Sequence, residues 1–242
     1  MELRGKSALV TGAGQRVGRA IAFGLAKRGV HVALHHFQSE KGAKATAMDF
    51  EVMGVRAPTL RADLAVAEEA EALAGRAREA LGALDIVVAS AAVMERRPLA
   101  EVTPADWDRT MDLNLRGTFF VAKGAAAVFG EQGGAIVNVA DVAAFERWRD
   151  YPVHCISKAG VVALTENLAK TLAPRIRVNA VAPGPVELPV GWDDAAAKRI
   201  LDTTPLRRLG RVDDVVNAVL FLLESDFITG STLVVDGGRR VR

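Results

Sequence analysis

The chain has 242 residues, 50% hydrophobic and 25% charged, which is the composition of one α/β domain large enough to bury a substantial core. Its 31 basic and 29 acidic residues are interspersed and leave a formal charge of +2, so the charge pattern gives no ground for nucleic-acid binding. We expect a cytoplasmic protein without a signal peptide or membrane contact, because the chain starts in a strand pattern, carries one cysteine and has no apolar run near the roughly 20 residues of a membrane-spanning helix.

Short apolar segments alternate with longer helical patterns along the whole chain. Several of the apolar segments are nearly continuous, as a parallel strand covered by helices on both faces requires. Helical patterns lie between them, for example at 17–29 and at 158–174, the second ended by Pro174. The alternation predicts a single domain, residues 1–242, with a Rossmann-type, doubly wound parallel α/β sheet. The seven expected strands are 6–10, 31–36, 57–62, 84–90, 135–140, 176–182 and 232–236.

The first strand runs into a glycine-rich turn, TGAGQRVG at residues 11–18, and a helix follows at once. Glycines permit a tight turn and close backbone approach, and a helix N-terminus offers free N–H groups to a pyrophosphate. Such a turn alone is often only a turn, but its place between strand and helix favours a dinucleotide site. The cofactor-binding residues expected in this turn are Gly12, Gln15, Arg16, Val17 and Gly18.

The end of the second strand bears on the choice between NAD and NADP. An NAD site usually places Asp or Glu here to bind the ribose 2′-hydroxyl. This sequence offers His36 and Ser39 instead, and Arg16 lies in the glycine turn. Without a carboxylate to repel a 2′-phosphate, and with an arginine to pair with it, NADP(H) is preferred over NAD(H). The alternative is that these side chains are merely solvated. Asp63, after the third strand, could bind adenine or cap the next helix.

Seven segments occur in the order typical of the short-chain dehydrogenase/reductase family, and the chain resembles that family over almost its whole length. These are TGAGQRVG, RADL, VVASAA, LNLRG, HCISK, VAPGPV and VVDGG. The resemblance implies a single Rossmann domain, a small-molecule substrate, and a homotetramer or homodimer. It also implies cofactor contacts at Asp63, Leu64, Ala91, Lys158, Pro183 and Gly184.

More narrowly, the chain is similar to the bacterial pteridine reductase-like branch. Arg16 stands where most family members have the second glycine of the turn, LHHFQS is similar to a 2′-phosphate segment, and Asp141 stands where most carry a catalytic serine. Two features depart from the pattern. The strand end ASAA lacks the polar groups that brace the nucleotide loop, and Met94 stands where that branch tends to have a ring stacked on the pterin.

The resemblance implies four catalytic positions, Asn114, Asp141, His154 and Lys158. In the family the asparagine anchors a water through a local helix distortion, and the lysine holds the nicotinamide ribose beside a proton-donating tyrosine. Here that tyrosine is His154, which shares a helix face with Lys158. We hypothesise that Asp141 orients His154 and favours its imidazolium as the proton source. Tyr151 is the rival donor, and in a third interpretation water or substrate supplies the proton.

We therefore expect an NADPH-dependent reductase of a small carbonyl or pteridine-like substrate, with no metal site. The alternatives are an alcohol or sugar dehydrogenase, an oxoacyl reductase, or a catalytically weakened NADP-binding protein. Residues 183–198 are expected to form a substrate loop. Met94, Tyr151 and Trp192 are the expected substrate contacts, and Trp148 also flanks the cleft.

Overall fold

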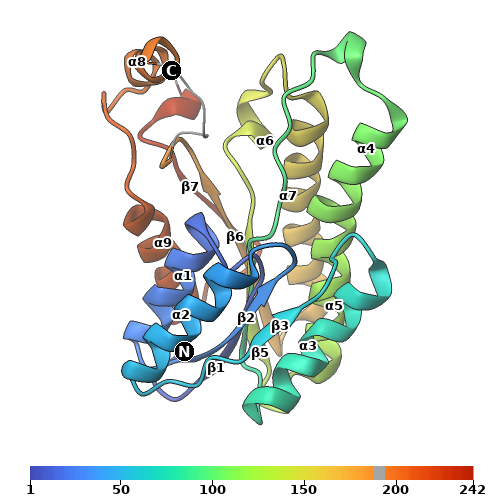
Figure 1. Ribbon diagram of the computed structural model, residues 1–242, viewed down its shortest axis with the longest axis vertical. Helices are drawn as coiled ribbons and strands as arrows, with labels where there is room; N and C mark the ends of the chain where they lie inside the picture. Colours follow the sequence, from blue (N-terminus) through green and yellow to red (C-terminus); the bar gives the residue numbers. More distant parts are fainter. Residues whose placement is uncertain (188–193, 242) are drawn as a thin grey trace.

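The computed structural model describes residues 1–187 and 194–241 (Figure 1). All seven expected strands are present and form one parallel sheet in the order β3-β2-β1-β4-β5-β6-β7. Their bounds are β1 Ser7–Val10, β2 His31–His36, β3 Thr59–Arg61, β4 Ile86–Ala89, β5 Gly134–Val139, β6 Ile176–Pro183 and β7 Thr232–Val235. The predicted Rossmann-type fold is therefore confirmed.

Helices cover both faces of the sheet (Figure 1). Their bounds are α1 Arg16–Lys27, α2 Glu40–Val52, α3 Ala67–Leu81, α4 Pro104–Met111, α5 Thr118–Val128, α6 Ala143–Glu146, α7 Pro152–Leu172, α8 Asp194–Thr203 and α9 Val212–Glu224. A π-helical turn, Asp112–Gly117, joins α4 to α5, and 3₁₀ turns lie at Leu99–Glu101 and Arg239–Val241.

Side chains of each central strand alternate between the two helical layers. Ala8 and Val10 of β1 pack in one core with α1 and α9, whereas Leu9 packs in the other core with α3 and α5. Because both faces are buried, polar residues would be costly at either set of positions. This explains why the strands read as continuous apolar runs rather than as alternating ones.

The strand order reverses beside β1, and this reversal creates the ligand-binding end of the sheet. β1 pairs with β2 on one side and with β4 on the other, so the connections after β1 and β4 lead to opposite faces. Ligands of open α/β sheets bind at such a switch point, at the carboxyl ends of the strands. The glycine turn comes directly after β1, and the segment that contacts Asn114 comes after β4. Both therefore lie at this end of the sheet.

The expected substrate loop, residues 183–198, is only partly a loop. Pro183 still belongs to β6, and residues 194–198 form the first half of α8. The loop prediction is wrong for these two parts, because a helix only ten residues long beside a proline-rich stretch gives little periodic signal. Residues 188–193, including Trp192, lie outside the described residues.

Among the described residues, no helix is both long and apolar enough to cross a membrane.

Candidate active site

The glycine turn forms a close-packed cradle at the start of α1. A Cβ atom at Gly14 would overlap the Ser39 hydroxyl, and one at Gly18 would overlap the Gly12 carbonyl. Gly12 and Arg16 both adopt positive φ, +67° and +50°. Gln15 is the N-cap of α1 and makes no side-chain capping bond, so the first N–H groups of the helix are left for another partner. The turn therefore suits a bound diphosphate.

His35 supports the glycine turn through two hydrogen bonds, a role that the sequence did not reveal. Its Nδ1 accepts a hydrogen bond from the Gly12 N–H at 3.1 Å, and its Nε2 donates to the Ala62 carbonyl, also at 3.1 Å. Burial lowers the pKa of His35 from 6.5 to about 4, so the ring is neutral at physiological pH. Thr11 adds a second brace, because its hydroxyl accepts the N–H groups of Ser90 and Ala91. These contacts connect the glycine turn to β2 and to the ASAA strand end after β4.

The expected 2′-phosphate end brings together His36, Ser39 and two arginines. His36 is buried, and its Nδ1 has no hydrogen-bond partner within the part of the chain that the structure describes. Ser39 is the N-cap of α2 and makes no side-chain capping bond. Arg16 is exposed and pairs with Glu187 at 3.1 Å. Arg61, which sequence reasoning missed, is in register with His36 across the sheet and adds a second cation.

Asp63 does not cap α3. Its carboxylate accepts the N–H of Ala65 at 3.0 Å, and the N-cap of α3 is Val66. The capping interpretation of Asp63 is therefore wrong, because the turn after β3 takes three more residues before the helix starts. Leu64 is buried in the core.

Asn114 lies in the π-helical turn, so a helix distortion is present where the resemblance implied one. Its Oδ1 accepts the Val93 N–H at 2.9 Å, and its Nδ2 donates to the Val93 carbonyl at 2.9 Å and to the Ser157 hydroxyl at 3.0 Å. The turn packs tightly at Gly117, where a Cβ would overlap the Leu64 carbonyl. Asn114 thus joins the strand end after β4 to the helix that carries His154.

His154 is 3% exposed and has a fixed orientation. Its Nδ1 lies 3.1 Å from the Val93 carbonyl, which can only accept, so Nδ1 carries a hydrogen. Its Nε2 lies 3.6 Å from Asp141 Oδ2, an ion-pair distance that is too long for a hydrogen bond. Asp141 is held in place because its other oxygen accepts the Ala143 N–H at 2.8 Å. The expected pairing of Asp141 with His154 is present.

Lys158 lies one turn further along α7 and is 4% exposed. Its ammonium donates to the Val139 carbonyl at 2.8 Å. Burial lowers the pKa of Lys158 to about 8, and the Asp141 carboxylate opposes this shift. A buried ammonium has three hydrogens to donate, which suits the ribose contact that the resemblance implies.

The remaining candidates surround this centre. Tyr151 is the N-cap of α7, and burial raises its pKa. Met94 directly follows Val93 and is 39% exposed. Cys155 is buried, and its sulfur accepts the Trp148 N–H at 3.1 Å, as a packing role requires. Asp236 forms a structural turn by accepting the Gly238 N–H.

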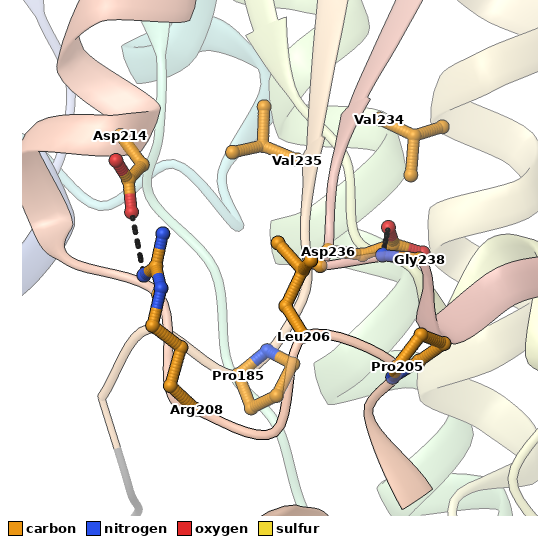
Figure 2. Close-up of a pocket in the computed structure, with 11 residues that line it drawn as sticks. Pro185, Pro205, Leu206, Arg208, Asp214, Val234, Val235, Asp236 and Gly238 are labelled. Atoms are coloured by element: carbon orange, nitrogen blue, oxygen red, sulfur yellow. Dashed lines mark hydrogen bonds and ion pairs between the residues drawn. The ribbon is translucent and has the colours of Figure 1, made fainter.

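A cavity of about 470 Å³ lies at the carboxyl ends of β6 and β7 (Figure 2). Pro185 and Leu206 lie along it, and the Arg208–Asp214 ion pair, 3.6 Å long, closes one side. Its lining includes neither His154 nor Lys158, so the cavity does not contain this pair. Pro183 and Gly184 lead from β6 toward this cavity, and a Cβ on Gly184 would come within 2.8 Å of Asp236.

Comparison with known proteins identifies the family. A family model described as enoyl-(acyl carrier protein) reductase matches residues 12–240. The 3-oxoacyl-[acyl-carrier-protein] reductase FabG of Staphylococcus aureus is 34% identical, over 96% of this chain and 97% of that protein. The chain belongs to the short-chain dehydrogenase/reductase family. Another member, D-erythrulose reductase of Gallus gallus, is 37% identical over 98% of this chain and 97% of its own.

A solved short-chain dehydrogenase/reductase structure has the same fold throughout. The FolM alternative dihydrofolate reductase 1 of Brucella canis, complexed with NADP, superposes with a TM-score of 0.94. It is 28% identical, over 100% of this chain and 96% of that one. The chain is therefore a short-chain dehydrogenase/reductase-type oxidoreductase. Within this fold His154 and Lys158 lie four residues apart on α7, so one helical turn separates them.

Proposed function

We propose that the protein is an NADPH-dependent reductase of a small carbonyl or pteridine-like compound, in which the Asp141–His154 pair supplies the proton. One observation carries the proposal. The only ring nitrogen of His154 that is not fixed by the Val93 carbonyl is Nε2, and it faces Asp141. A proton carrier is thus held beside a carboxylate, one helical turn from the buried Lys158.

Three features of the chain fit a bound NADP(H). The glycine turn leaves no room for a Cβ at Gly14 or Gly18. The chain therefore has bare backbone at these two positions by the start of α1. His36 has a buried Nδ1 that lacks a partner among the described residues, and Arg61 is in register with it across the sheet. Arg16, in the glycine turn, supplies a second positive charge if it leaves its ion pair with Glu187. When bound, NADPH would supply the hydride. The NADP complex of the Brucella canis relative supports the choice of cofactor.

His154 can donate a proton only from its imidazolium form. In the neutral ring the single hydrogen sits on Nδ1 and is bonded to Val93, so Nε2 has a lone pair. In the imidazolium, Nε2 also carries a hydrogen, which it can pass to an oxygen or nitrogen that gains negative charge. Asp141 stabilises that positive ring, and a positioned acid of this kind contributes roughly 10²–10⁴-fold in rate.

Lys158 limits the same reaction. Its positive charge favours binding of a cofactor ribose and of a developing negative charge, but it opposes a second positive charge on His154. Asp141 lies within electrostatic reach of both groups and offsets this repulsion. We infer that Asp141 is needed where most family members use a serine, because here the proton donor must become cationic.

Two kinds of substrate are consistent with the relatives. FabG and D-erythrulose reductase, by their names, act on carbonyl compounds, whereas FolM is named as a dihydrofolate reductase. Both reactions add hydride to the carbon of a C=O or C=N bond and a proton to its oxygen or nitrogen. Met94, 39% exposed beside Val93, gives a flexible apolar contact for either compound.

The proposal is tested by cofactor binding and turnover together. NADPH and NADH are titrated against the protein by fluorescence, and NADPH oxidation is then followed with ketones, sugars, oxoacyl thioesters and dihydropteridines. Preferred binding of NADPH and turnover of at least one compound are expected. A preference for NADH would contradict the cofactor assignment.

His154→Tyr distinguishes an adapted enzyme from a weakened one. If His154 is the working acid, the tyrosine variant should be no faster than the wild type on the same compounds, whereas a large gain would show a weakened wild-type site in which Lys158 and Asn114 remain competent. If NADPH binds tightly but neither form turns over any compound, the protein is an NADP-binding protein and the reductase proposal is wrong.

A further inference from the structure

The C-terminal turn contacts the segment between Asp141 and His154. Arg239 donates from Nε to Glu146 Oε2 at 3.0 Å and from Nη1 to the Thr203 hydroxyl at 3.0 Å. The two charged side chains are 13% and 7% exposed, in contrast to the surface pair Arg28–Glu224 at 50% and 41%. Arg240 adds a cation over the Phe145 ring at 4.8 Å. This is a buried clamp rather than a surface ion pair.

Glu146 connects Arg239 to Trp148. The carboxylate oxygen that accepts from Arg239 also accepts from the indole N–H of Trp148, at 2.5 Å. The main chain of Trp148 is fixed as well: its N–H donates to the sulfur of Cys155, and its carbonyl accepts from the Tyr151 N–H at 3.1 Å. Three contacts therefore set the position and the tilt of the indole.

The indole lies beside the proposed proton donor. The rings of Trp148 and His154 are nearly parallel, at 16°, with centroids 6.3 Å apart. Tyr151 meets the same indole edge-on at 5.8 Å. A chain of contacts thus runs from Arg239 through Glu146 and Trp148 to His154.

We propose that Arg239 is a positioning residue: through Glu146 it holds Trp148 against His154 and so shapes the substrate side of the catalytic centre. The inference rests on the proposed role of His154. Without the arginine, the buried Glu146 carboxylate would lose this ion pair, which favours its protonation or a turn of the side chain toward solvent. Either change releases the indole from the orientation it has beside His154.

The first test needs neither substrate nor cofactor. The chain has three tryptophans, so Trp107→Phe with Trp192→Phe leaves Trp148 as the sole indole fluorophore. In this background Arg239→Gln is expected to raise the acrylamide quenching constant about twofold or more, because a released side chain exchanges between rotamers and becomes accessible. Arg239→Lys should stay close to the parent, and the surface control Arg28→Gln should not change. Equal quenching in Arg239→Gln and its parent would overturn the proposal.

The second test separates positioning from stability. In the otherwise unaltered protein, Arg239→Gln is expected to lower kcat about tenfold, raise KM for the carbonyl substrate, and leave the NADPH dissociation constant unchanged. Arg239→Lys should restore most of the rate. A lower melting temperature with normal kcat and KM would show a purely structural role and overturn the inference.

Trp148→Phe keeps the test decisive if Arg239→Gln does not fold. Phenylalanine retains the aromatic face but has no N–H for Glu146, so the ion pair stays intact while its link to the ring is lost. It should lower kcat in the same direction, with unchanged NADPH binding, and normal kinetics would overturn the inference. If no compound is turned over at all, the quenching result still decides on Arg239, while the reductase proposal fails separately.

Discussion

At the scale of single residues, the site is defined by the hydrogen-bond partners of its titratable side chains and by the protons that these side chains can give up. His154 is bonded to the Val93 carbonyl through Nδ1, and its buried Nε2 faces Asp141. The sequence predicted the Asp141–His154 pair from the resemblance, and it predicted that His154 and Lys158 share a face. It could not predict the Val93 carbonyl, because a backbone acceptor in an irregular segment has no side-chain signature.

Lys158 gives a prediction about cofactor binding. Burial lowers its pKa to about 8, so the ammonium loses its proton as the pH rises through that value. If the charged form holds the cofactor, the NADPH dissociation constant should rise about tenfold between pH 7 and 9.5, where the 2′-phosphate is already ionised. Fluorescence titration at both pH values measures this. In Lys158→Met the constant should be high and independent of pH over the same range, and an identical rise in that variant would refute the assignment.

At the scale of elements, short irregular pieces position the chemistry between regular ones. The π-helical turn brings Asn114 to Val93, and the glycine turn is pressed against Ser39 at the start of α2. Long apolar strands and the body of α7 were predictable from periodicity. The short helix α8 was not, because a ten-residue helix carries few periodic positions.

Asn114→Ala should destabilise the protein by about 2–4 kcal/mol, because it removes three hydrogen bonds at the π-helical turn and leaves the Val93 N–H without its partner. Urea unfolding at neutral pH measures the change. The matched control is Asn167→Ala on the exposed face of α7, for which a change within about 0.5 kcal/mol is expected. Equal effects of the two substitutions would show that the turn does not depend on Asn114.

Two glycines make a paired prediction about space. At Gly14 an added Cβ would overlap the Ser39 hydroxyl, so Gly14→Ala must separate the glycine turn from α2 and should weaken NADPH binding about tenfold or more. At Gly75, inside α3, an added Cβ meets nothing within 4 Å, so Gly75→Ala should stabilise the protein by about 0.5–1 kcal/mol with unchanged binding. Titration and urea unfolding of both variants provide the check. Normal NADPH affinity in Gly14→Ala would contradict the placement of the cofactor.

At the scale of the whole molecule, the proposed cofactor-binding end of the sheet is supported by a buried histidine, His35. The seven strands and the parallel, doubly wound sheet were predicted from the apolar runs and their helical connections, whereas the order of the strands comes from the structure. The supporting role of His35 was not predicted, because the sequence pattern does not distinguish a buried histidine at a strand end from a solvated one. Only the structure places His35 between the Gly12 N–H and the Ala62 carbonyl.

His35 makes stability depend on pH in a defined window. Its pKa is 6.5 in the unfolded chain and about 4 in the folded protein, so between these values the unfolded chain binds more protons. The free energy of unfolding should therefore fall as the pH is lowered, with His35 contributing a loss of about 2 kcal/mol between pH 7 and 5.

Urea unfolding at the two pH values measures this loss. His35→Asn can still accept the Gly12 N–H but cannot take up a proton, so its stability should fall by about 2 kcal/mol less over the same interval. The same pH dependence in both proteins would exclude His35 as its source.

The most direct measurement is the pH dependence of kcat for reduction, in the wild type and in His154→Gln. If the imidazolium is the acid, the wild-type rate falls as rising pH removes its proton, and this fall is absent in His154→Gln, whose rate is lower by roughly 10²–10⁴-fold. Asp141→Asn should lower the wild-type rate at neutral pH in the same direction. An unchanged rate and an unchanged pH profile in His154→Gln would contradict the assignment of His154 as the proton donor.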